Sequence, residues 1–368
     1  VTGTDAVTVD GSKIGSDAST TISGASVTAQ NAAGIYGTTG VDIDATADDG
    51  VVKIDNSRVQ AGQFGIKDGK YVAKDNAANL TIDAKGNIDI VSSQVGASGT
   101  AAVTGADVTV DGSDLASIDA LTVTGKNVKV EGGANVVSHA NVTVTGTDAV
   151  TVDGSKIGSD ATITISGASV TAQNTAGIYG KAGIDIDATT SVTVADSKVQ
   201  AGQFTQDAEG KYVATGTPAN LTIDATAGNV DITDDAQVGA SGTATVNASG
   251  AVTVDGSDLV SIDALTVSGA DFAAKNGANV AAHNAVAIEG TTSVTVDGSK
   301  IGSDASTTIS GGTVTVDNGG AVYGETDVNI TATSGDADIE TVKAKSGAVT
   351  VTAKQNASVD ALTAGTDA

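Results

Sequence analysis

The chain has 368 residues, with 47 glycines, a single proline and no cysteine, methionine or tryptophan. Its 44 acidic and 18 basic residues give a formal net charge of −26, which argues against binding to the phosphates of nucleic acid or to anionic lipid. The aromatic residues are five Tyr and three Phe, so any core must be thin and built from small or β-branched side chains. A broad globular core is therefore not expected.

The first residues of the chain belong to a long repeat. Residues 1–37 recur almost unchanged at 144–180, and the phrase VTVDGSKIGSDA returns a third time from Val294. Self-similarity at a fixed period is typical of array architectures. The recurrences divide the chain into long repeats 1–143, 144–287 and 288–368, of which the last is partial.

A shorter phrase inside each long repeat predicts β-strands. In Val7–Ile14 apolar and polar residues alternate, an Asp-Gly step follows, and an apolar residue closes the phrase. The alternation is typical of a half-buried strand, and Asp-Gly is typical of a tight turn. Equivalent phrases follow at Val52–Val59, Ile88–Val95, Val108–Leu115, Val150–Ile157, Val192–Val199, Val252–Leu259 and Val294–Ile301.

The spacing of these strands predicts a solenoid. Apolar strand centres recur about every 21 residues, as at Val144, Ile165 and Ile186, and one coil of a β-helix with three short strands requires about this length. We therefore predict an all-β parallel β-helix that runs as a single continuous solenoid over 1–368. About 17 coils at ~4.8 Å each would form a rod on the order of 80 Å long, with a lumen too narrow for large aromatics. An array of separate β-sandwiches is the alternative.

Several phrases resemble the repeat region of filamentous-haemagglutinin-like bacterial exoproteins. They are Gly335–Ile339 (GDADI), Ser346–Ala353 (SGAVTVTA) and the SGxxVTA motif at Ser23–Ala29 and Ser166–Ala172. The resemblance implies a right-handed β-helical stalk that is exported by two-partner secretion or as an autotransporter passenger, is displayed at the cell surface and serves adhesion. The amino-terminal secretion domain of that family is not visible here, so the secretion route stays open.

Two stretches interrupt the coil rhythm. Residues 60–80 and 200–221 each carry a Phe, a turn and then Lys-Tyr-Val, which predicts a β-hairpin inserted into the coil. Loops on a rigid scaffold often carry recognition, so the candidate contacts to a receptor or a neighbouring chain are Phe64, Tyr71, Phe204 and Tyr212. The alternative is that these aromatics pack the hairpins onto the flank of the solenoid. Tyr36, Tyr179 and Tyr323 likewise suit either a carbohydrate platform or a coil corner.

Repeated aspartates raise the question of a bound cation. Asp10, Asp153 and Asp297 occupy the same turn in successive repeats. If such carboxylates met on adjacent coils, each pair would cost about 1 kcal/mol even at the dielectric of water, and Ca²⁺ would relieve that repulsion. The alternative is that they are solvated turn residues. His139 and His283 are repeat equivalents without a neighbouring Cys or His, so no transition-metal site is expected.

No nucleophile motif or phosphate-binding loop is found, so we expect a structural or adhesive rod rather than an enzyme. Two alternatives stay open. A pair of carboxylates on a groove would suit a β-helical carbohydrate-active or carbohydrate-binding protein. Thr-x-Thr steps, as at Thr122/Thr124, Thr143/Thr145 and Thr350/Thr352, would suit ice binding, although they are scattered in the sequence.

The two ends of the chain stop within the coil pattern. Unpaired strand edges favour further pairing, so we expect either more repeats in a longer protein or self-association, end to end or lateral, into fibres. The other expected partner is the surface or matrix of a host or neighbouring cell.

Overall fold

The computed structural model describes residues 1–67, 70–74, 76–206 and 212–365. These residues form an all-β structure without a helix, in which parallel strands stack as a β-solenoid of about 16 turns with a spacing of about 21 residues. The prediction of a parallel β-helix is thereby confirmed. Two compact units are distinguished, Val1–Gly180 and Lys181–Ala368, and each is described by itself. The prediction of one continuous solenoid over 1–368 stays a prediction.

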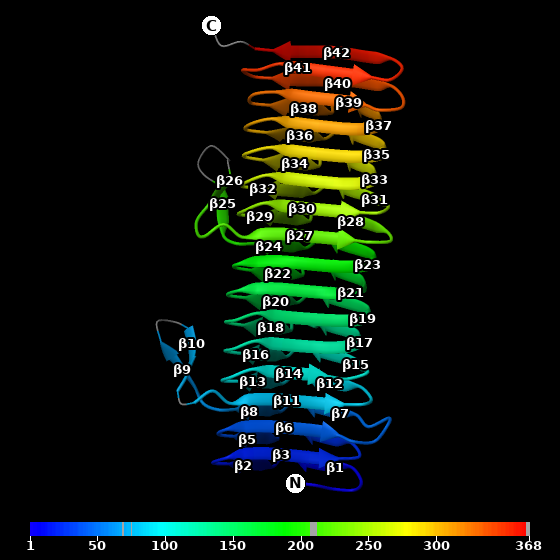
Figure 1. Cartoon of the computed structure of the whole chain (residues 1–368). Coiled ribbons are helices and arrows are strands. Elements are labelled where there is room, and N and C mark those ends of the chain that lie inside the picture. The colour runs from blue at the N-terminus through cyan, green and yellow to red at the C-terminus, as the bar shows by residue number, and fades with distance from the viewer. Residues whose placement is uncertain (68–69, 75, 207–211, 366–368) are drawn as a thin grey trace. The chain divides into compact units, whose positions relative to one another are not determined.

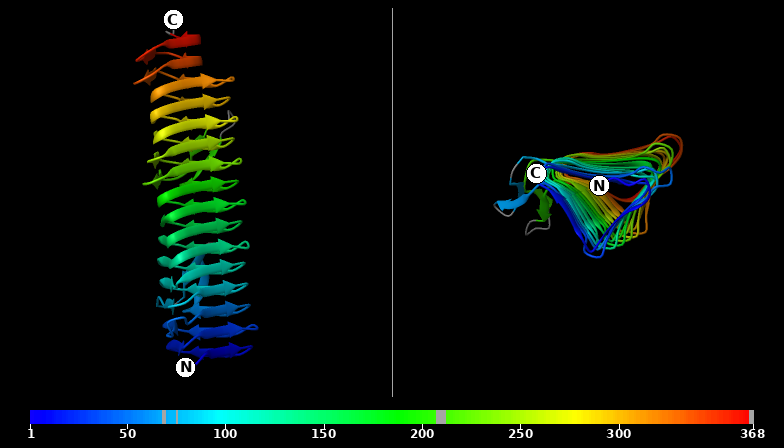
Figure 2. Two further views of the ribbon diagram at one scale, coloured as in Figure 1. Left: turned by 90° about the vertical axis from the view of Figure 1, so that its right-hand side faces the viewer. Right: turned by 90° about the horizontal axis from the view of Figure 1, so that it is seen from below.

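Each coil has three sides, which Figure 2 shows end on. We call them the first, second and third faces in chain order. Within each unit the strands of one face pair in parallel with those of the preceding and following coils (Figure 1). In the first unit β6, β11 and β14 of the first face lie on the side nearest the viewer of Figure 1.

The strands of the first unit follow this scheme. The first face holds β3 (Ser19–Gly24), β6 (Gly40–Ala45), β11 (Asn79–Ala84) and β14 (Ala101–Thr104). The second face holds β1 (Val7–Asp10), β4 (Val27–Gln30), β7 (Val52–Asp55), β12 (Ile88–Val91) and β15 (Asp107–Asp111). Three longer strands span both faces, namely β17 (Leu121–Glu131), β19 (Val142–Asp153) and β21 (Thr162–Gln173). The third face holds β2 (Lys13–Ser16), β5 (Gly34–Gly37), β8 (Arg58–Ala61), β13 (Gln94–Ala97), β16 (Asp114–Ser117), β18 (Asn135–Ser138), β20 (Lys156–Ser159) and β22 (Gly177–Gly180).

The second unit repeats the scheme. The first face holds β27 (Asn220–Ala225), β30 (Ala244–Ala248), β39 (Val328–Ala332) and β41 (Val349–Ala353), and the second holds β28 (Asn229–Thr233) and β31 (Ala251–Asp255). Strands that span both are β23 (Gly183–Ala195), β33 (Leu265–Lys275), β35 (Val286–Asp297) and β37 (Thr307–Asp317). The third face holds β24 (Lys198–Ala201), β29 (Gln237–Ala240), β32 (Asp258–Ser261), β34 (Asn279–Ala282), β36 (Lys300–Ser303) and β38 (Ala321–Gly324). Strands β40 (Ala337–Ala344) and β42 (Ala357–Ala364) span the second and third faces.

The merged strands differ from the expected three short strands per coil. In β17 and β19 the chain bends from the first face to the second without leaving the ladder, and the pairing shifts between Gly125 and Asn127. A similar shift lies between Gly146 and Ala149. Because the extra residue is absorbed as a β-bulge, the corner is a bend in one strand rather than a turn between two.

The inward side chains form the predicted aliphatic lumen. In β17 the inward residues Leu121, Val123, Val128 and Val130 are at most 1% exposed, and they stack on equivalent residues of the neighbouring coils. Burial of each such side chain contributes about 1.5–3 kcal/mol relative to its exposed state. The stacked aliphatic columns are therefore the main source of stability in each unit.

One aromatic side chain enters this lumen, against the prediction that it has no room for one. Phe272 of β33 is 1% exposed and lies between Val252 and Val294 of the adjacent coils. The next inward position of the same strand is Ala274, where β17 carries a valine. A smaller neighbour thus compensates for the larger ring, as close packing requires.

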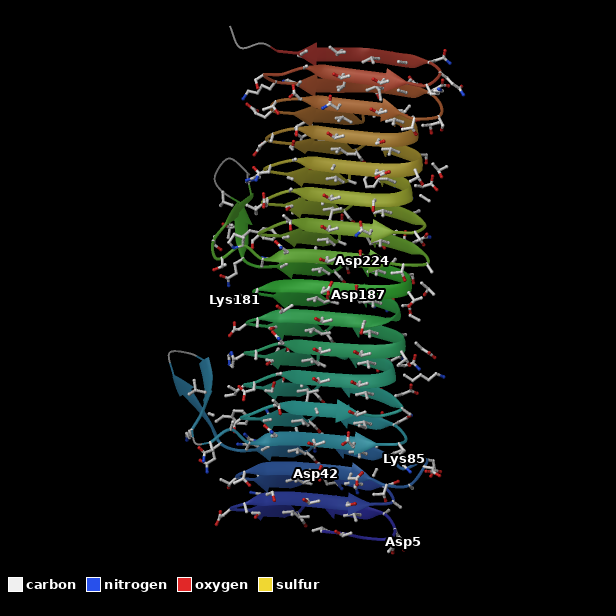
Figure 3. All side chains as sticks on the ribbon, viewed as in Figure 1. Asp5, Asp42, Lys85, Lys181, Asp187 and Asp224 are labelled. Atoms are coloured by element: carbon white, nitrogen blue, oxygen red, sulfur yellow. The ribbon has the colours of Figure 1, made fainter. Side chains whose placement is uncertain are left out.

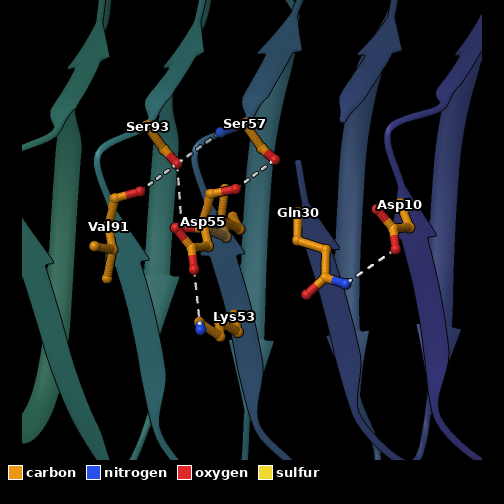
Figure 4. A network of polar contacts seen from close by, with 8 residues as sticks. Asp10, Gln30, Lys53, Asp55, Ser57, Val91 and Ser93 are labelled. Atoms are coloured by element: carbon orange, nitrogen blue, oxygen red, sulfur yellow. Dashed lines mark hydrogen bonds and ion pairs between the residues drawn. The ribbon is translucent and has the colours of Figure 1, made fainter. Parts of the chain in front are cut away.

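Buried serines tie neighbouring coils together at the corner between the second and third faces (Figure 4). The Oγ of Ser93 accepts a hydrogen bond from the Ser57 amide at 3.0 Å and donates to the Val91 carbonyl at 2.6 Å. Ser113 repeats the arrangement one coil further on, where its Oγ accepts from the Ser93 amide at 2.9 Å. These hydroxyls satisfy amides that the lumen would otherwise leave without a partner.

We expect Ser93→Ala to lower the free energy of unfolding by about 1–3 kcal/mol, because the buried Ser57 amide loses its acceptor. Denaturant titration of the full chain measures the change. Ser92→Ala is the matched control, since Ser92 is the exposed neighbour of the same type. An equal loss in both variants would contradict the role given to the Ser93 hydroxyl.

Candidate functional site

An antiparallel pair, β9 (Phe64–Lys67) and β10 (Lys70–Ala73), lies within residues 60–80, between β8 and β11. Phe64 at its base lies over Gly96 on the third face, because a Cβ atom at Gly96 would sit 3.5 Å from the Phe64 Cζ atom. A larger residue at Gly96 would meet the ring. The glycine therefore leaves the space in which the hairpin rests against the coil.

The second hairpin, β25 (Phe204–Gln206) and β26 (Tyr212–Ala214), repeats this contact within residues 200–221. A Cβ atom at Gly239 would lie 2.8 Å from Phe204 Cζ and 2.9 Å from Val260 Cγ2. Val260 points away from the lumen on the third face, yet it is 5% exposed. The ring of Phe204 and the side chain of Val260 thus pack in one small apolar cluster outside the coil.

These contacts separate the four predicted contact residues into two groups. Phe64 and Phe204 pack the hairpins onto the third face, as the alternative interpretation expected. The side chains of Tyr71 and Tyr212 lie outside the described residues. A receptor contact through the hairpins stays a prediction.

Both hairpins join the coil through the same polar contacts. The side-chain amide of Gln60 donates to the Gly62 carbonyl at 2.9 Å, and the Ala78 amide donates to the Ser98 Oγ at 3.1 Å. In the second unit Gln200 donates to the Gly202 carbonyl at 3.1 Å, and the Ala219 amide donates to Ser241 at 3.0 Å. The residues at which the chain leaves the coil and re-enters it are therefore held by hydrogen bonds at both hairpins.

The aspartates proposed as cation contacts accept hydrogen bonds from the next coil. Asn31 donates its side-chain amide to Asp10 at 2.7 Å, Asn174 does so to Asp153 at 2.7 Å, and Asn318 to Asp297 at 2.7 Å. The asparagines adopt positive φ angles, for example 58° at Asn31, which aims their side chains at the preceding coil. The sequence indicated a turn at each aspartate but not this amide partner.

The asparagine amides also stabilise the ionised aspartates. Asn31, and to a smaller extent Gln30, lowers the pKa of Asp10, and Asn174 with Gln173 does the same for the pKa of Asp153. Figure 4 shows the bond from the Gln30 side-chain amide to Asp10, at 3.2 Å. Pairing with the following coil places Gln30 beside Asp10 and Gln173 beside Asp153. A cation contact at Asp10 or Asp153 stays a prediction.

Asp297 differs, because the paired residue on the next coil is Asp317. The Oδ1 atom of Asp317 is buried without a hydrogen-bond partner. Across the described ranges no group of three His, Cys, Asp or Glu side chains is placed to hold a metal ion. A Ca²⁺ contact at Asp297 stays a prediction.

An acidic hollow of about 300 Å³ lies on the first face of the first unit. It is lined by Asp44, Ala45, Thr46, Asp83, Ala84, Lys85 and Thr104. Asp44 on β6 and Asp83 on β11 are paired across adjacent coils, while Lys85 forms an ion pair with Asp48 at 2.7 Å. Figure 3 looks onto this face, with Asp42 and Lys85 labelled.

The electrostatics of the hollow follow from this pairing. Partial burial raises the pKa of Asp83, a hydrogen bond with Thr104 opposes the shift, and the charges of Asp42 and Asp44 add to it. Burial, Asp187 and Asp224 raise the pKa of Asp185 in the second unit in the same way. The phrase IDA occurs at 43–45, 82–84, 186–188 and 223–225, but also at 118–120 and 262–264, so the sequence alone does not mark the hollow.

We expect Asp83→Asn to stabilise the first unit at pH 7 by about 0.5 kcal/mol, a value reduced by solvent screening. The folded-state pKa of Asp83 is raised, so its contribution to stability is present below the unfolded pKa and is lost as pH rises through the folded pKa. The gain should vanish well below pH 3.8, the ordinary value for the carboxyl. Thermal melts at both pH values measure it.

Asp89→Asn is the control for that prediction, because Asp89 lies opposite Lys53 in the strand register of the neighbouring coil, although the ion pair of Lys53 is with Asp55. Removal of an attracted charge should give no stabilisation at pH 7. If Asp83→Asn stabilised the chain equally at pH 7 and well below pH 3.8, the ordinary value for the carboxyl, the gain could not come from removal of the Asp83 charge.

The repeated tyrosines and His139 lie on or beside the third face. The Tyr36 ring lies over Gly34 of its own strand, since a Cβ atom there would be 2.6 Å from Tyr36 Cε2. Lys156 lies with its ammonium 5.2 Å from the centre of the Tyr179 ring. His139 pairs with Asp160 through Nδ1 at 2.7 Å. A carbohydrate platform on these tyrosines stays a prediction.

No protein family, curated protein or solved structure matches the chain. The part of the chain that the structure describes contains no helix with the length and apolar character needed to span a membrane.

Proposed function

We propose that the chain is a structural or adhesive repeat rod that is displayed outside the cell as part of a filamentous-haemagglutinin-like surface adhesin or fibre. Its coils set length and stiffness, and the two hairpins on the third face are the first candidates for contact with a host surface, a matrix or a neighbouring chain. Self-association into fibres, end to end or lateral, is the second mode of partnership that we propose.

The observation that carries this proposal is that one coil design recurs with the same stabilising contacts. The hydrogen bond from the Asn31 side chain to Asp10 is repeated between Asn174 and Asp153. The contact of Phe64 with Gly96 is repeated between Phe204 and Gly239. Repetition of whole coils suits a part whose task is to span distance, because nearest-neighbour contacts are all that each coil requires.

Small-angle X-ray scattering and an adhesion assay test the proposal together. A continuous rod should give a largest dimension on the order of 80 Å or more in solution, and a compact particle would refute it. Beads coated with the full chain should bind matrix or host cells. Phe64→Ala combined with Phe204→Ala should reduce that binding if the hairpins carry it, whereas Val137→Ala on the same face should not.

The acidic hollow favours a second candidate, a β-helical carbohydrate-active protein. Asp44 and Asp83 are paired on adjacent coils, whose strands are about 4.8 Å apart, and retaining glycosidases hold their two carboxyl groups about 5–5.5 Å apart. The raised pKa of Asp83 would suit the general acid. Incubation with a glycan panel tests this candidate. Release of reducing ends that is lost in Asp83→Asn would support it, and no release would exclude it for that panel.

A further inference from the structure

The threonine steps that are scattered in the sequence meet on one face of the first unit. Pairing places Ala102, Thr122, Thr143 and Thr164 in one column along the unit. A second column, two residues further along each strand, consists of Thr104, Thr124, Thr145 and Ser166. The strands β14, β17, β19 and β21 thus present a two-dimensional array of small side chains, of which all but Ala102 carry a hydroxyl.

The array has two regular spacings. Neighbouring coils are about 4.8 Å apart, and residues two apart on one strand are about 6.6 Å apart. The spacing between coils is close to the shorter repeat distance of the oxygen lattice of ice, and the spacing along the strand is somewhat shorter than the next repeat distance. The first-face strands of successive coils also lie in line along the unit (Figure 2), without the strong twist of ordinary sheets, so the spacings hold over the whole array.

The side chains of the array are held in place. Threonine is β-branched and has few χ1 rotamers, and the array residues of β17, β19 and β21 are half-buried between their neighbours on the adjacent coils, whereas Thr104 is exposed. Thr145 and Ser166 are also joined by a hydrogen bond of 3.1 Å between their hydroxyls. Because each hydroxyl both donates and accepts, a rigid array of them offers fixed positions to an ordered layer of water.

The eight positions of the array carry no charge in a strongly acidic chain, although Asp83 on β11 is paired with Thr104 at one end of the array. None of the eight side chains is ionisable, while the chain holds 44 acidic residues. The other two faces of the same coils do carry charges, with Lys129 between Thr109 and Thr151 on the second face and Asp114 on the third. A charged group would bind its own hydration shell and disturb a lattice of water.

The second unit carries a related array. Thr245, Thr266, Ala287 and Thr308 form one column. Asn247, Ser268, Glu289 and Ser310 form the other. Glu289 is the one charged residue among these eight positions. The pattern is therefore not confined to one set of coils.

We propose that the part of the first face formed by β14, β17, β19 and β21 is an ice-binding surface, whose ligand is a crystalline layer of water held by the threonine columns. Each threonine contributes a hydroxyl that fits a lattice position and a methyl group that occupies the space between rows. The proposal is independent of adhesion through the hairpins, since Phe64 and Phe204 pack on the third face.

The test compares two double variants of the full chain. Thr143→Lys with Thr266→Lys places a charge in each array, whereas Thr151→Lys with Thr253→Lys places the same charge on the second face of strands β19 and β31. Thermal hysteresis and inhibition of ice recrystallisation are measured, and circular dichroism and thermal melts confirm that both variants fold. Where the lysine variants do not fold, Thr143→Val with Thr266→Val removes the hydroxyls at nearly constant volume.

The unmodified chain should show thermal hysteresis and halt recrystallisation. The first-face variant should lose at least five-fold in activity, while the second-face variant should keep it. Absence of both activities in the unmodified chain, or equal loss in the two variants, would overturn the proposal. Binding to crystalline cellulose or chitin without any effect on ice would likewise overturn it, since the array would then fit a solid polysaccharide rather than ice.

Discussion

Replacement of Leu121 by alanine should lower the free energy of unfolding by about 2–5 kcal/mol. The side chain is fully buried on β17, between Ala101 and Val142 of the adjacent coils. Because the neighbour Ala101 is already small, the shortened side chain would leave a cavity that no adjacent group can fill. Denaturant titration gives the total loss, and hydrogen exchange should place it in β14, β17 and β19, since each coil is stabilised by its neighbours.

Leu362→Ala is the control for this prediction, because Leu362 is 53% exposed and its truncation should change stability by no more than about 0.5 kcal/mol. Leu121→Met keeps the volume and should cost less than about 1.5 kcal/mol. If Leu121→Ala were no more harmful than Leu362→Ala, the lumen would not be the source of stability that we describe.

Replacement of Gly202 by valine should cost about 2–5 kcal/mol and release the second hairpin from the third face. Gly202 has a φ angle of 74°, a conformation that β-branched residues avoid. Any Cβ atom there would also clash with Ser241 Oγ and lie 2.9 Å from the Ala219 Cβ. Limited proteolysis within 200–221 and a thermal melt measure the two effects.

Gly216→Val is the comparison for that result. Gly216 lies in the same inserted stretch and is exposed, and a Cβ atom at this position would have Gln203 Oε1, at 3.9 Å, as its nearest neighbour. This variant should be cut no faster than the unmodified chain. Faster cleavage of both variants would mean that any bulky residue in the stretch disturbs the hairpin.

The fold was predictable because its signals are local and repeated. The alternation in Val7–Asp10 and the Asp-Gly turn after it each follow from residue type alone. The sequence did not reveal which residues of adjacent coils lie side by side. Asn31 beside Asp10, or Thr143 beside Thr122, requires the register of two strands 20 or so residues apart, and that register depends on how each corner absorbs its extra residue.

The same limit applies to the aromatic residues and the acidic hollow. Composition predicted a lumen without large rings, yet Phe272 fits because Ala274 stands next to it. Asp44 and Asp83 are far apart in sequence because the first hairpin lies between them, and they meet only when β6 pairs with β11. The fit of two neighbouring side chains and the pairing of two strands are properties of the assembled coil. The composition of the chain does not reveal them.

The bulged corner between the first and second faces bears on how such a gene can change in length. Coils of unequal size stack because the difference is taken up at one place, near Gly125 and Gly146, while the rest of each rung keeps its partners. Unequal crossing-over between similar stretches of DNA would therefore add or remove whole coils. The junction need not fall at one exact residue, because the corner can absorb a small difference in coil length. A molecule built in this way can be made longer or shorter over generations while its cross-section is preserved.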